Sequence, residues 1–302
     1  MTSARAPHPA SPRPRCQTPL SLLGAALFLA LAAPLAAQPA RIVSTAPGVT
    51  EILYALGLGP RIVGVTTFCR HPAEAQSKPK IGTFIEPDFE RILAQRPDLV
   101  FVIRNPVDLA ARLRRLGLRV EELRLDTVDE ILASIRQAGR AAGAAAAADA
   151  LALRLRADLD RLRAASRARP PVSVLYIIDR TPGTLQGMFA AGPGSYLGEL
   201  IALAGGRNLA PAAGGAFPKL SLEQVLAADP EVLIDMGDYS HGRPSTPASR
   251  QAKLALWSAY PNLRAVRHRR VYDVSSDEFV VPGPRLAQAA RALAEMLHGP
   301  AR

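Results

Sequence analysis

Cysteine, histidine and aromatic residues are scarce in this chain of 302 residues. It contains two cysteines, five histidines and one tryptophan, and aromatic residues make up 5% of the sequence. We expect Cys16 to be removed with an N-terminal segment, which leaves Cys69 alone and excludes a disulfide within the mature chain. A lone thiol of this kind is either a small buried apolar residue or a group that faces a ligand.

The shortage of histidine argues against a receptor for free zinc or manganese. Such sites need three or four histidine or carboxylate ligands that converge, and the histidines of this chain are widely scattered. The chain also lacks a Walker A loop, an HExxH motif and a nucleophile elbow. A Gly-x-Gly pattern in AGPGSYLG (191–198) is not followed by the acidic residue that a dinucleotide fold needs. An exported hydrolase or chelatase is therefore a minor alternative.

Positive charge is abundant, with a net charge of +11 and an isoelectric point near 10.4. This balance is typical of nucleic-acid-binding proteins, but the arginines alternate with leucine and alanine in stretches such as ARLRRLGLR (111–119). No aromatic stacking motif lies beside them. We interpret these stretches as the solvated faces of amphipathic helices, and we expect no nucleic-acid partner.

The pattern of residues 1–37 is that of a secretory signal peptide. A basic, acid-free stretch precedes the apolar run LSLLGAALFLALAAPLAA (20–37), and we predict cleavage near Ala37. Pro14 interrupts the basic stretch, so no twin-arginine signal is present, and Cys16 precedes the apolar run, where it cannot anchor a lipoprotein. No later segment is apolar enough over its length to span a bilayer. The sequence predicts a soluble exported protein; an uncleaved anchor is the alternative.

Short apolar runs alternate with helical patterns along the rest of the chain, which predicts the α/β class with parallel sheets covered by helices. The helix after the first strand is expected to begin near Thr50, and Thr127 with Glu130 reads as a capping box. Residues 238–251 are expected to form a polar loop. The predicted strands are 41–45, 61–66, 98–103, 119–123, 172–178, 231–236 and 270–275.

One long helix is expected between the two alternating halves. Ala144 to Arg169 is nearly free of helix breakers and would form a rod of roughly 40 Å. Such a rod holds two lobes apart, and the space between domains is where small molecules bind. The predicted organisation is a signal peptide (1–37), an N-terminal lobe (38–142), a backbone helix (143–169) and a C-terminal lobe (170–302).

The two halves share sequence patterns. PDFERILAQRPDLVFV (87–102) matches LSLEQVLAADPEVLID (220–235), and this match places Glu90 over Glu223. A second match, TEILYALG with GELIALAG, places Glu51 over Glu199. The repeats indicate two lobes built from the same units.

Five segments in order resemble the class III periplasmic substrate-binding proteins of ABC importers, in which one helix joins two Rossmann-like lobes. The resemblance covers residues 41–297 and is greatest to the cobalamin-binding members. It implies a monomeric periplasmic protein that captures its ligand without catalysis or an intrinsic cofactor. The segments are RIVSTAPGVTEILYALG, VGVTTFCRHPAEAQ, FIEPDFERILAQRPDLV, FPKLSLEQVLAADPEVLI and SSDEFVVPGPRL.

The resemblance also implies roles for individual residues. Glu90 and Glu223 match the glutamates that dock into arginine pockets of a membrane permease dimer, where a carboxylate can meet a guanidinium bidentately. Phe68, Phe84 and Phe217 match aromatic residues that hold a cobalt corrinoid, although the resembled protein carries tyrosine or tryptophan there. The polar contact of the corrinoid site corresponds to Asp277.

Further candidates leave the ligand open between a corrinoid, an iron-siderophore and haem. Tyr196 is a candidate for lining the cleft, although such a residue more often packs at a helix start. Cys69 and His71 are weak candidates for ligating the metal of a bound complex, and a loop without metal is the alternative. Arg104 and Lys219 are candidates for pairing with an anionic ligand.

Overall fold

The structure is a computed structural model that describes residues 1–3, 38–104, 108–237, 246–274 and 276–299. Almost all of the expected signal peptide lies outside these residues. The segment from Gln38 to the end of the chain folds as one compact unit. None of the described helices combines the length and the apolar character needed to cross a membrane.

The first half contains a parallel sheet with the strand order β2-β1-β3-β4. Ile42 pairs with Ile62 on one side and with Leu99 on the other, so apolar side chains lie in register. Successive residues point to opposite faces, and both faces are covered by helices, which explains why β1, β2 and β3 are largely apolar, whereas the edge strand β4 carries Glu121 and Glu122. The strands are β1 (Ile42–Ser44), β2 (Ile62–Val65), β3 (Leu99–Ile103) and β4 (Val120–Leu123). The helical segments are α1 (Pro47–Ala55), η1 (Gly59–Arg61), η2 (Ala73–Ser77), α2 (Phe89–Ala94), α3 (Leu109–Arg115) and α4 (Val128–Ala142).

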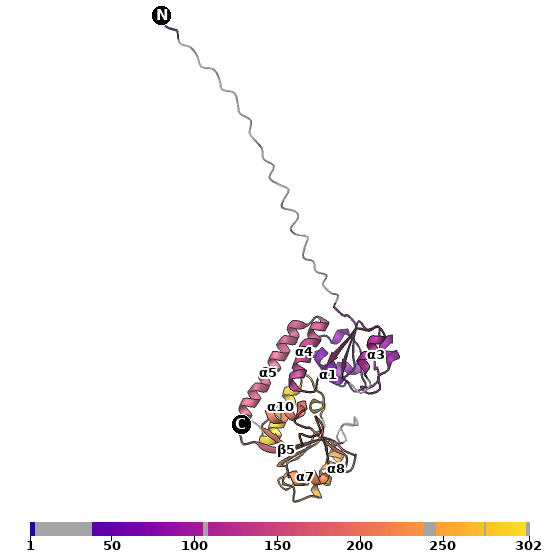
Figure 1. Cartoon of the computed structure of the whole chain (residues 1–302), viewed down its shortest axis with the longest axis vertical. Coiled ribbons are helices and arrows are strands. Elements are labelled where there is room, and N and C mark those ends of the chain that lie inside the picture. The colour runs from indigo at the N-terminus through magenta and orange to yellow at the C-terminus, as the bar shows by residue number, and fades with distance from the viewer. Residues whose placement is uncertain (4–37, 105–107, 238–245, 275, 300–302) are drawn as a thin grey trace. The chain divides into compact units, whose positions relative to one another are not determined.

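Two antiparallel helices join the halves. α4 ends at Gly143, whose φ of 76° lets the chain reverse into α5 (Ala145–Arg167). A side chain at Gly139 would meet the Ala148 Cβ at 2.3 Å, so glycine permits the close approach of the two helices. α5 continues along α4 toward the second sheet, where it packs against α6 and α10 (Figure 1). With 23 residues it is about 35 Å long, slightly shorter than expected.

The second half contains a mixed sheet with the order β10-β9-β5-β6-β8, and β7 pairs with β5. The expectation of a parallel sheet holds for β5, β7, β9 and β10 but is wrong for β6 and β8. Only a short loop separates β5 from β6, so the chain must turn back on itself, and a parallel pairing would need a longer crossover. The strands are β5 (Val172–Asp179), β6 (Met188–Ala190), β7 (Gly206–Asn208), β8 (Lys219–Leu220), β9 (Val232–Asp235) and β10 (Val271–Asp273).

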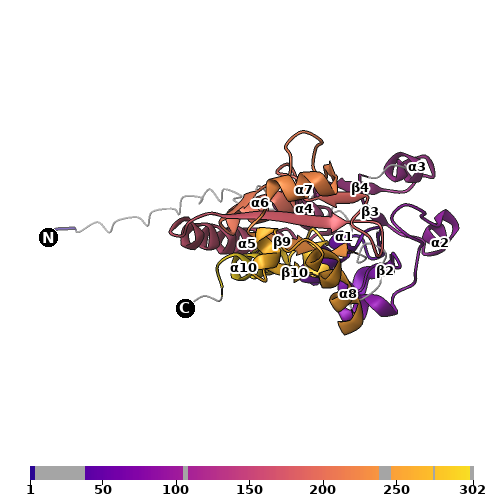
Figure 2. The same ribbon diagram turned by 90° about the horizontal axis from the view of Figure 1, so that it is seen from below.

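Helices cover both faces of the second sheet. Figures 1 and 2 show α7 and α10 on opposite sides of β5. The α10 side belongs to an apolar cluster that continues without a break through α5 and α4 to the first sheet. The helical segments are α6 (Tyr196–Leu203), α7 (Leu222–Ala228), α8 (Pro247–Ser258), α9 (Arg264–Arg267), η4 (Asp277–Phe279) and α10 (Leu286–His298).

Three local expectations are corrected by the structure. α1 begins at Pro47, not at Thr50, because proline is favoured at the first helical position, where no N–H is needed. Thr127 accepts a hydrogen bond from the Glu130 N–H, but the Glu130 carboxylate pairs with Arg124, so the capping box is one-sided. Part of the expected loop 238–251 is helical, because Thr246 caps α8.

The longer sequence repeat is also a structural repeat. Each copy forms a short helix followed by a buried strand, α2 with β3 and α7 with β9. Arg96 and Asp229, which are equivalent in the repeat, both adopt a left-handed conformation after the helix, with φ of 45° and 41°. A proline follows each of them and prevents the helix from continuing.

Candidate functional site: a cleft between the two sheets

Two adjoining cavities of about 490 and 350 Å³ lie at the carboxyl ends of strands from both sheets. Ile103 ends β3, Asp179 ends β5 and Met236 follows β9, and all three line the larger cavity. Ligands of open α/β sheets bind at this end of the strands. The two cavities share five lining residues, so we treat them as one cleft: Phe84, Ile103, Leu125, Val280 and Pro282.

Aromatic rings face the cleft from both halves. Phe84 from the first half and Phe217 from the second line the larger cavity, and Phe68 lines the smaller one. Phe68 and Phe217 are each 44% exposed, an unfavourable environment for a large apolar side chain unless a ligand covers it. Aromatic side chains contributed by both halves suit a large, flat and largely apolar ligand.

Phe84 and Phe217 are themselves equivalent in the repeat, since the spacing between them equals that between Glu90 and Glu223. Each comes two residues after a glycine with positive φ, Gly82 at 91° and Gly215 at 77°. The same turn therefore presents one phenylalanine from each half.

Four charged residues line the larger cavity, Arg104, Arg124, Asp126 and Asp179. Arg104 lines it and has no ion pair among the described residues. Arg124 also lines it, but its guanidinium is bound 2.6 Å from a carboxylate oxygen of Glu130. Lys219, the other cationic candidate, lines a different cavity near α8, so the structure does not bring it to this cleft.

Tyr196 is a buried wall residue of the larger cavity. Its hydroxyl donates a hydrogen bond to the Phe279 carbonyl oxygen at 3.2 Å, and its N–H donates to the Asp126 carbonyl oxygen at 2.7 Å. Burial, followed by the negative charge of Glu51, raises its pKa far above the ordinary value. The phenol therefore stays protonated, and its hydroxyl already donates its hydrogen bond within the protein.

The side chain of Cys69 is buried in the apolar core and lines neither cavity of the cleft. Its sulfur lies 3.1 Å from the hydroxyl oxygens of both Thr50 and Thr66. Burial raises the pKa of the thiol, against the lowering effect of these hydrogen bonds. A protonated, buried thiol is a poor metal ligand and behaves as a small apolar residue.

His71 and Asp277 are not among the residues that line the cleft. His71 is exposed and lines a separate cavity of about 650 Å³. Asp277 forms an ion pair with Arg70 at 3.9 Å, which joins the two halves. Within the described ranges, no group of three or more histidine, cysteine or acidic residues is placed to hold a metal ion.

Sequence reasoning missed two contacts that join the halves. Glu51 of α1 forms a bidentate ion pair with Arg285, directly before α10, at 2.5 and 2.9 Å. Burial raises the pKa of Glu51, although Arg285 acts to lower it. In the other direction, Glu199 of α6, in the second half, accepts a hydrogen bond at 2.7 Å from the N–H of Val128, the first residue of α4 in the first half.

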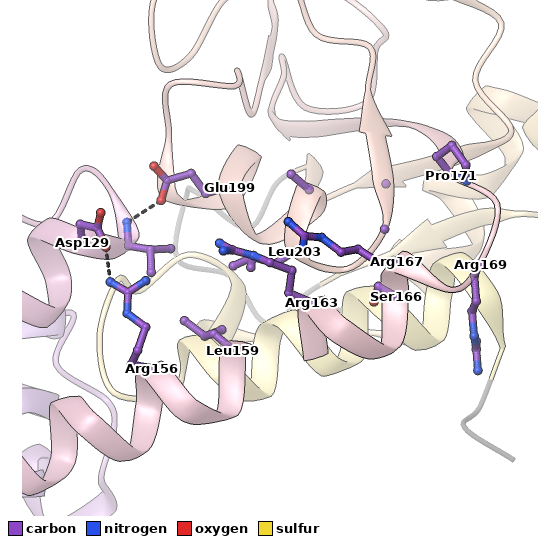
Figure 3. Close-up of a pocket in the computed structure, with 14 residues that line it drawn as sticks. Asp129, Arg156, Leu159, Arg163, Ser166, Arg167, Arg169, Pro171, Glu199 and Leu203 are labelled. Carbon is purple, nitrogen blue, oxygen red and sulfur yellow. Dashed lines mark hydrogen bonds and ion pairs between the residues drawn. The ribbon is translucent and has the colours of Figure 1, made fainter. Parts of the chain in front are cut away.

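Figure 3 shows the second contact, with Glu199 directed toward the start of α4. The cavity beside it, about 610 Å³, lies along α5 and shares no lining residue with the cleft. Because Glu51 and Glu199 are equivalent in the shorter repeat, each half uses the same helix position to hold the start of a helix in the other half. We call this pair of contacts the reciprocal clamp. The match of Glu51 with Glu199 in the shorter repeat is the sequence feature that could have indicated the reciprocal clamp.

The apolar walls of the cleft were also missed. Ile103 and Leu125 come at or just after the ends of predicted strands, so the rule for carboxyl ends could have identified them. Val280 and Pro282 lie in a loop without a strong pattern. Their position depends on Gly48, because a side chain there would lie 2.2 Å from the Pro282 carbonyl oxygen.

Glu90 and Glu223 are exposed and lie outside the cleft. Each is the second residue of its helix, α2 or α7, where the partial positive charge of the helix N-terminus favours a carboxylate. A hydrogen bond with Ser221 lowers the pKa of Glu223. Both groups are therefore suited to a cationic partner.

Comparison with known proteins gives a consistent result. Residues 42–278 match the family model described as periplasmic binding protein. The vitamin B12-binding protein of Vibrio cholerae is 28% identical over 279 residues, which cover 90% of this chain and 95% of that protein. An uncharacterised ABC transporter substrate-binding lipoprotein of Bacillus subtilis, YvrC, is 26% identical over 269 residues, 86% of this chain and 81% of that protein.

Solved structures agree in fold. The periplasmic vitamin B12-binding protein BtuF of Vibrio cholerae has a TM-score of 0.72 at 26% identity, covering 86% of this chain and 97% of that chain. The periplasmic haem-binding protein RhuT of Roseiflexus has a TM-score of 0.73 at 28% identity, covering 85% and 97%. With its two helix-linked sheets, its cleft between them and a family match that spans most of its length, the chain belongs to the periplasmic binding protein family.

Proposed function

We propose that this protein captures a cobalamin-type corrinoid in the periplasm and delivers it to the permease of an ABC importer. The observation that carries the proposal is the largely apolar cleft at the carboxyl ends of both sheets, lined by Phe84 from one half and Phe217 from the other. Relatives named for vitamin B12 binding support it. The mechanism is capture and release: the ligand covers exposed aromatic surface, and no bond is made or broken.

The chemistry of the walls favours a ligand whose metal is already fully coordinated. In cyanocobalamin the corrin ring and two axial ligands saturate the cobalt, whereas haem iron has open axial positions. Among the described residues that line the cleft, no imidazole or thiol is present, and the Tyr196 phenol is bound to a carbonyl. Tyr239 and His241 lie in 238–245, outside the described residues, and both are therefore substituted in the ligand titration.

Haem or an iron-siderophore is the second candidate. The similarity to a haem-binding structure supports it. Arg104 also supports it, because a guanidinium that has no ion pair within the described ranges and lines a largely apolar cavity suits a propionate or another carboxylate.

Calorimetric titration of the purified protein with cyanocobalamin, haemin and a ferric siderophore tests the choice. We expect cyanocobalamin to bind and haemin to bind much more weakly. The second candidate would replace the proposal if the protein binds haemin but not cyanocobalamin, and if haemin binding is lost in Tyr239→Phe or His241→Ala. The absorption spectrum of the protein purified from its native host is an independent check, since corrinoids and haem absorb differently.

We further propose that Glu90 and Glu223 dock the loaded protein onto arginines of the permease, one from each half. Charge reversal at both positions, Glu90→Arg with Glu223→Arg, should abolish uptake and leave ligand affinity unchanged. Asp160→Arg on α5 is the matched control, because Asp160 is also an exposed acid on a helix. Uptake that survives the double reversal would refute the docking roles.

A further inference from the structure

Two exposed leucines occupy equivalent positions beside the docking glutamates. Leu93 is 40% exposed and Leu226 is 37% exposed. Each comes three residues after its glutamate, Glu90 or Glu223, on the same helix. Residues three apart on a helix are neighbours on its surface, so each half presents an acid beside an apolar side chain.

The fold does not need these two side chains for its core. The preceding residues, Ile92 and Val225, are also equivalent, and they provide the buried contact of each helix at 0% exposure. Leu93 and Leu226 belong to none of the apolar clusters. Both are therefore apolar side chains that keep more than a third of their surface in water outside the buried clusters.

The doubling distinguishes these leucines from ordinary exposed apolar residues, which are normal when they occur singly. Leu116 and Leu153 are also exposed, but at the spacing of the longer repeat they correspond to Ser249 and to the buried Leu286. Among these four exposed leucines of the described residues, the two that are equivalent in the repeat are those beside the equivalent glutamates.

We propose that Leu93 and Leu226 are apolar anchors of the permease interface, each inserting into an apolar depression next to the cation that meets the neighbouring glutamate. The partner is a membrane permease with two like halves. This inference rests on the proposed function and deepens it: the carboxylate gives orientation and the leucine gives affinity, because burying a leucine removes apolar surface from water whereas an exposed ion pair contributes little.

Leu93→Ser and Leu226→Ser, singly and together, test the inference. The measurements are affinity for the host's corrinoid permease in lipid nanodiscs and uptake of cyanocobalamin. We expect each single change to weaken docking roughly tenfold and the double change roughly a hundredfold, from the cost of losing a buried leucine. Leu93→Met with Leu226→Met should retain docking, since methionine preserves volume and apolar character.

Leu153→Ser on α5 is the control, because Leu153 is 63% exposed and has no exposed equivalent in the other half. It should leave docking unchanged, and all variants should bind cyanocobalamin as the original protein does. Docking that is unaffected by the double change, or reduced equally by Leu153→Ser, would overturn the inference. If the glutamate reversals abolish docking and the leucine changes do not, only this inference fails; if cyanocobalamin does not bind at all, the proposed function fails first.

Discussion

At the scale of single residues, the cleft depends on two phenylalanines held by matching glycine turns. Truncating either ring removes the apolar face without touching the core, because both are at least partly exposed. We expect Phe84→Ala or Phe217→Ala to weaken cyanocobalamin binding roughly tenfold, the size of an aromatic contact together with its lost area. Phe189→Ala is the control, since Phe189 is exposed on β6 and lines neither cavity of the cleft. Equal loss in all three variants would contradict the assignment.

The Cys69 thiol is predicted to be unreactive and to take no part in ligand binding. Because it is buried, hydrogen-bonded to two threonines and raised in pKa, it should resist alkylation by iodoacetamide at about pH 8 in the folded protein. Mass spectrometry should show complete modification only after denaturation. Rapid modification of the native protein that is suppressed by a corrinoid would instead place the thiol in the ligand site.

Among the elements, the link between β9 and β5 is expected to depend on pH. One carboxylate oxygen of Glu231, just before β9, accepts hydrogen bonds from the Ser173 N–H at 2.8 Å and the Ser173 hydroxyl at 2.7 Å. These bonds lower the pKa of Glu231 in the folded state. A lowered pKa means that the stabilisation is fully present above the ordinary glutamate value, near 4.3, and is lost as the pH falls through the folded value.

Glu231→Gln should therefore lower the free energy of unfolding at pH 7 by about 1 kcal/mol, a modest figure because the carboxylate is partly solvated. Urea denaturation at pH 7 and at pH 3 measures it. The difference between the variant and the original protein should shrink at pH 3. A difference that is constant with pH would show that ionisation of Glu231 does not contribute.

Element type was predictable where the pattern was long. The alternation of apolar runs gave β1 to β5, β9 and β10, because each is buried between helices or packs within the core of its half. β6, β7 and β8 were missed because they do not belong to the alternation of strand and helix; β6 and β7 pair with β5, and β8 pairs with β6. α8 was missed because its first turn is polar and begins with a proline, so only the cap at Thr246 signalled it.

For the whole molecule, the reciprocal clamp should set how firmly the two sheets are held together. Glu51→Ala leaves the guanidinium of Arg285 without its carboxylate in a mostly buried place, and we expect a loss of about 2 to 3 kcal/mol in the free energy of unfolding. Glu199→Ala removes one acceptor from the start of α4 and should cost about 1 kcal/mol.

Hydrogen exchange can locate these effects. In Glu199→Ala the amide of Val128 should exchange faster, and in Glu51→Ala the first turn of α10 should do so. Since the two contacts share no residue, their costs should add in the double variant. Exchange rates unchanged at both helix starts would show that the reciprocal clamp does not hold these helix starts.

The candidate site was only partly accessible from the sequence. Phe84 and Phe217 were identified through resemblance, and the structure brings them to one cavity. Asp277 was placed by the same reasoning and stays a prediction; its ion pair with Arg70 was not foreseen, because a tertiary ion pair leaves no trace in a single sequence. Cys69 and His71 are close in sequence but lie in different surroundings, since the sulfur points into the core and the imidazole does not.

α5 has a consequence for the strength of docking. A helix that is packed against α4, α6 and α10 cannot act as a flexible tether, so the separation of the two proposed docking surfaces is fixed before any encounter. For a partner with two matching sites, the first contact then places the second at a high effective concentration, and the entropic cost of searching is avoided. The protein would behave as a rigid bivalent ligand: its overall affinity should far exceed that of either contact alone, and weakening one contact should lower the overall affinity by the same factor.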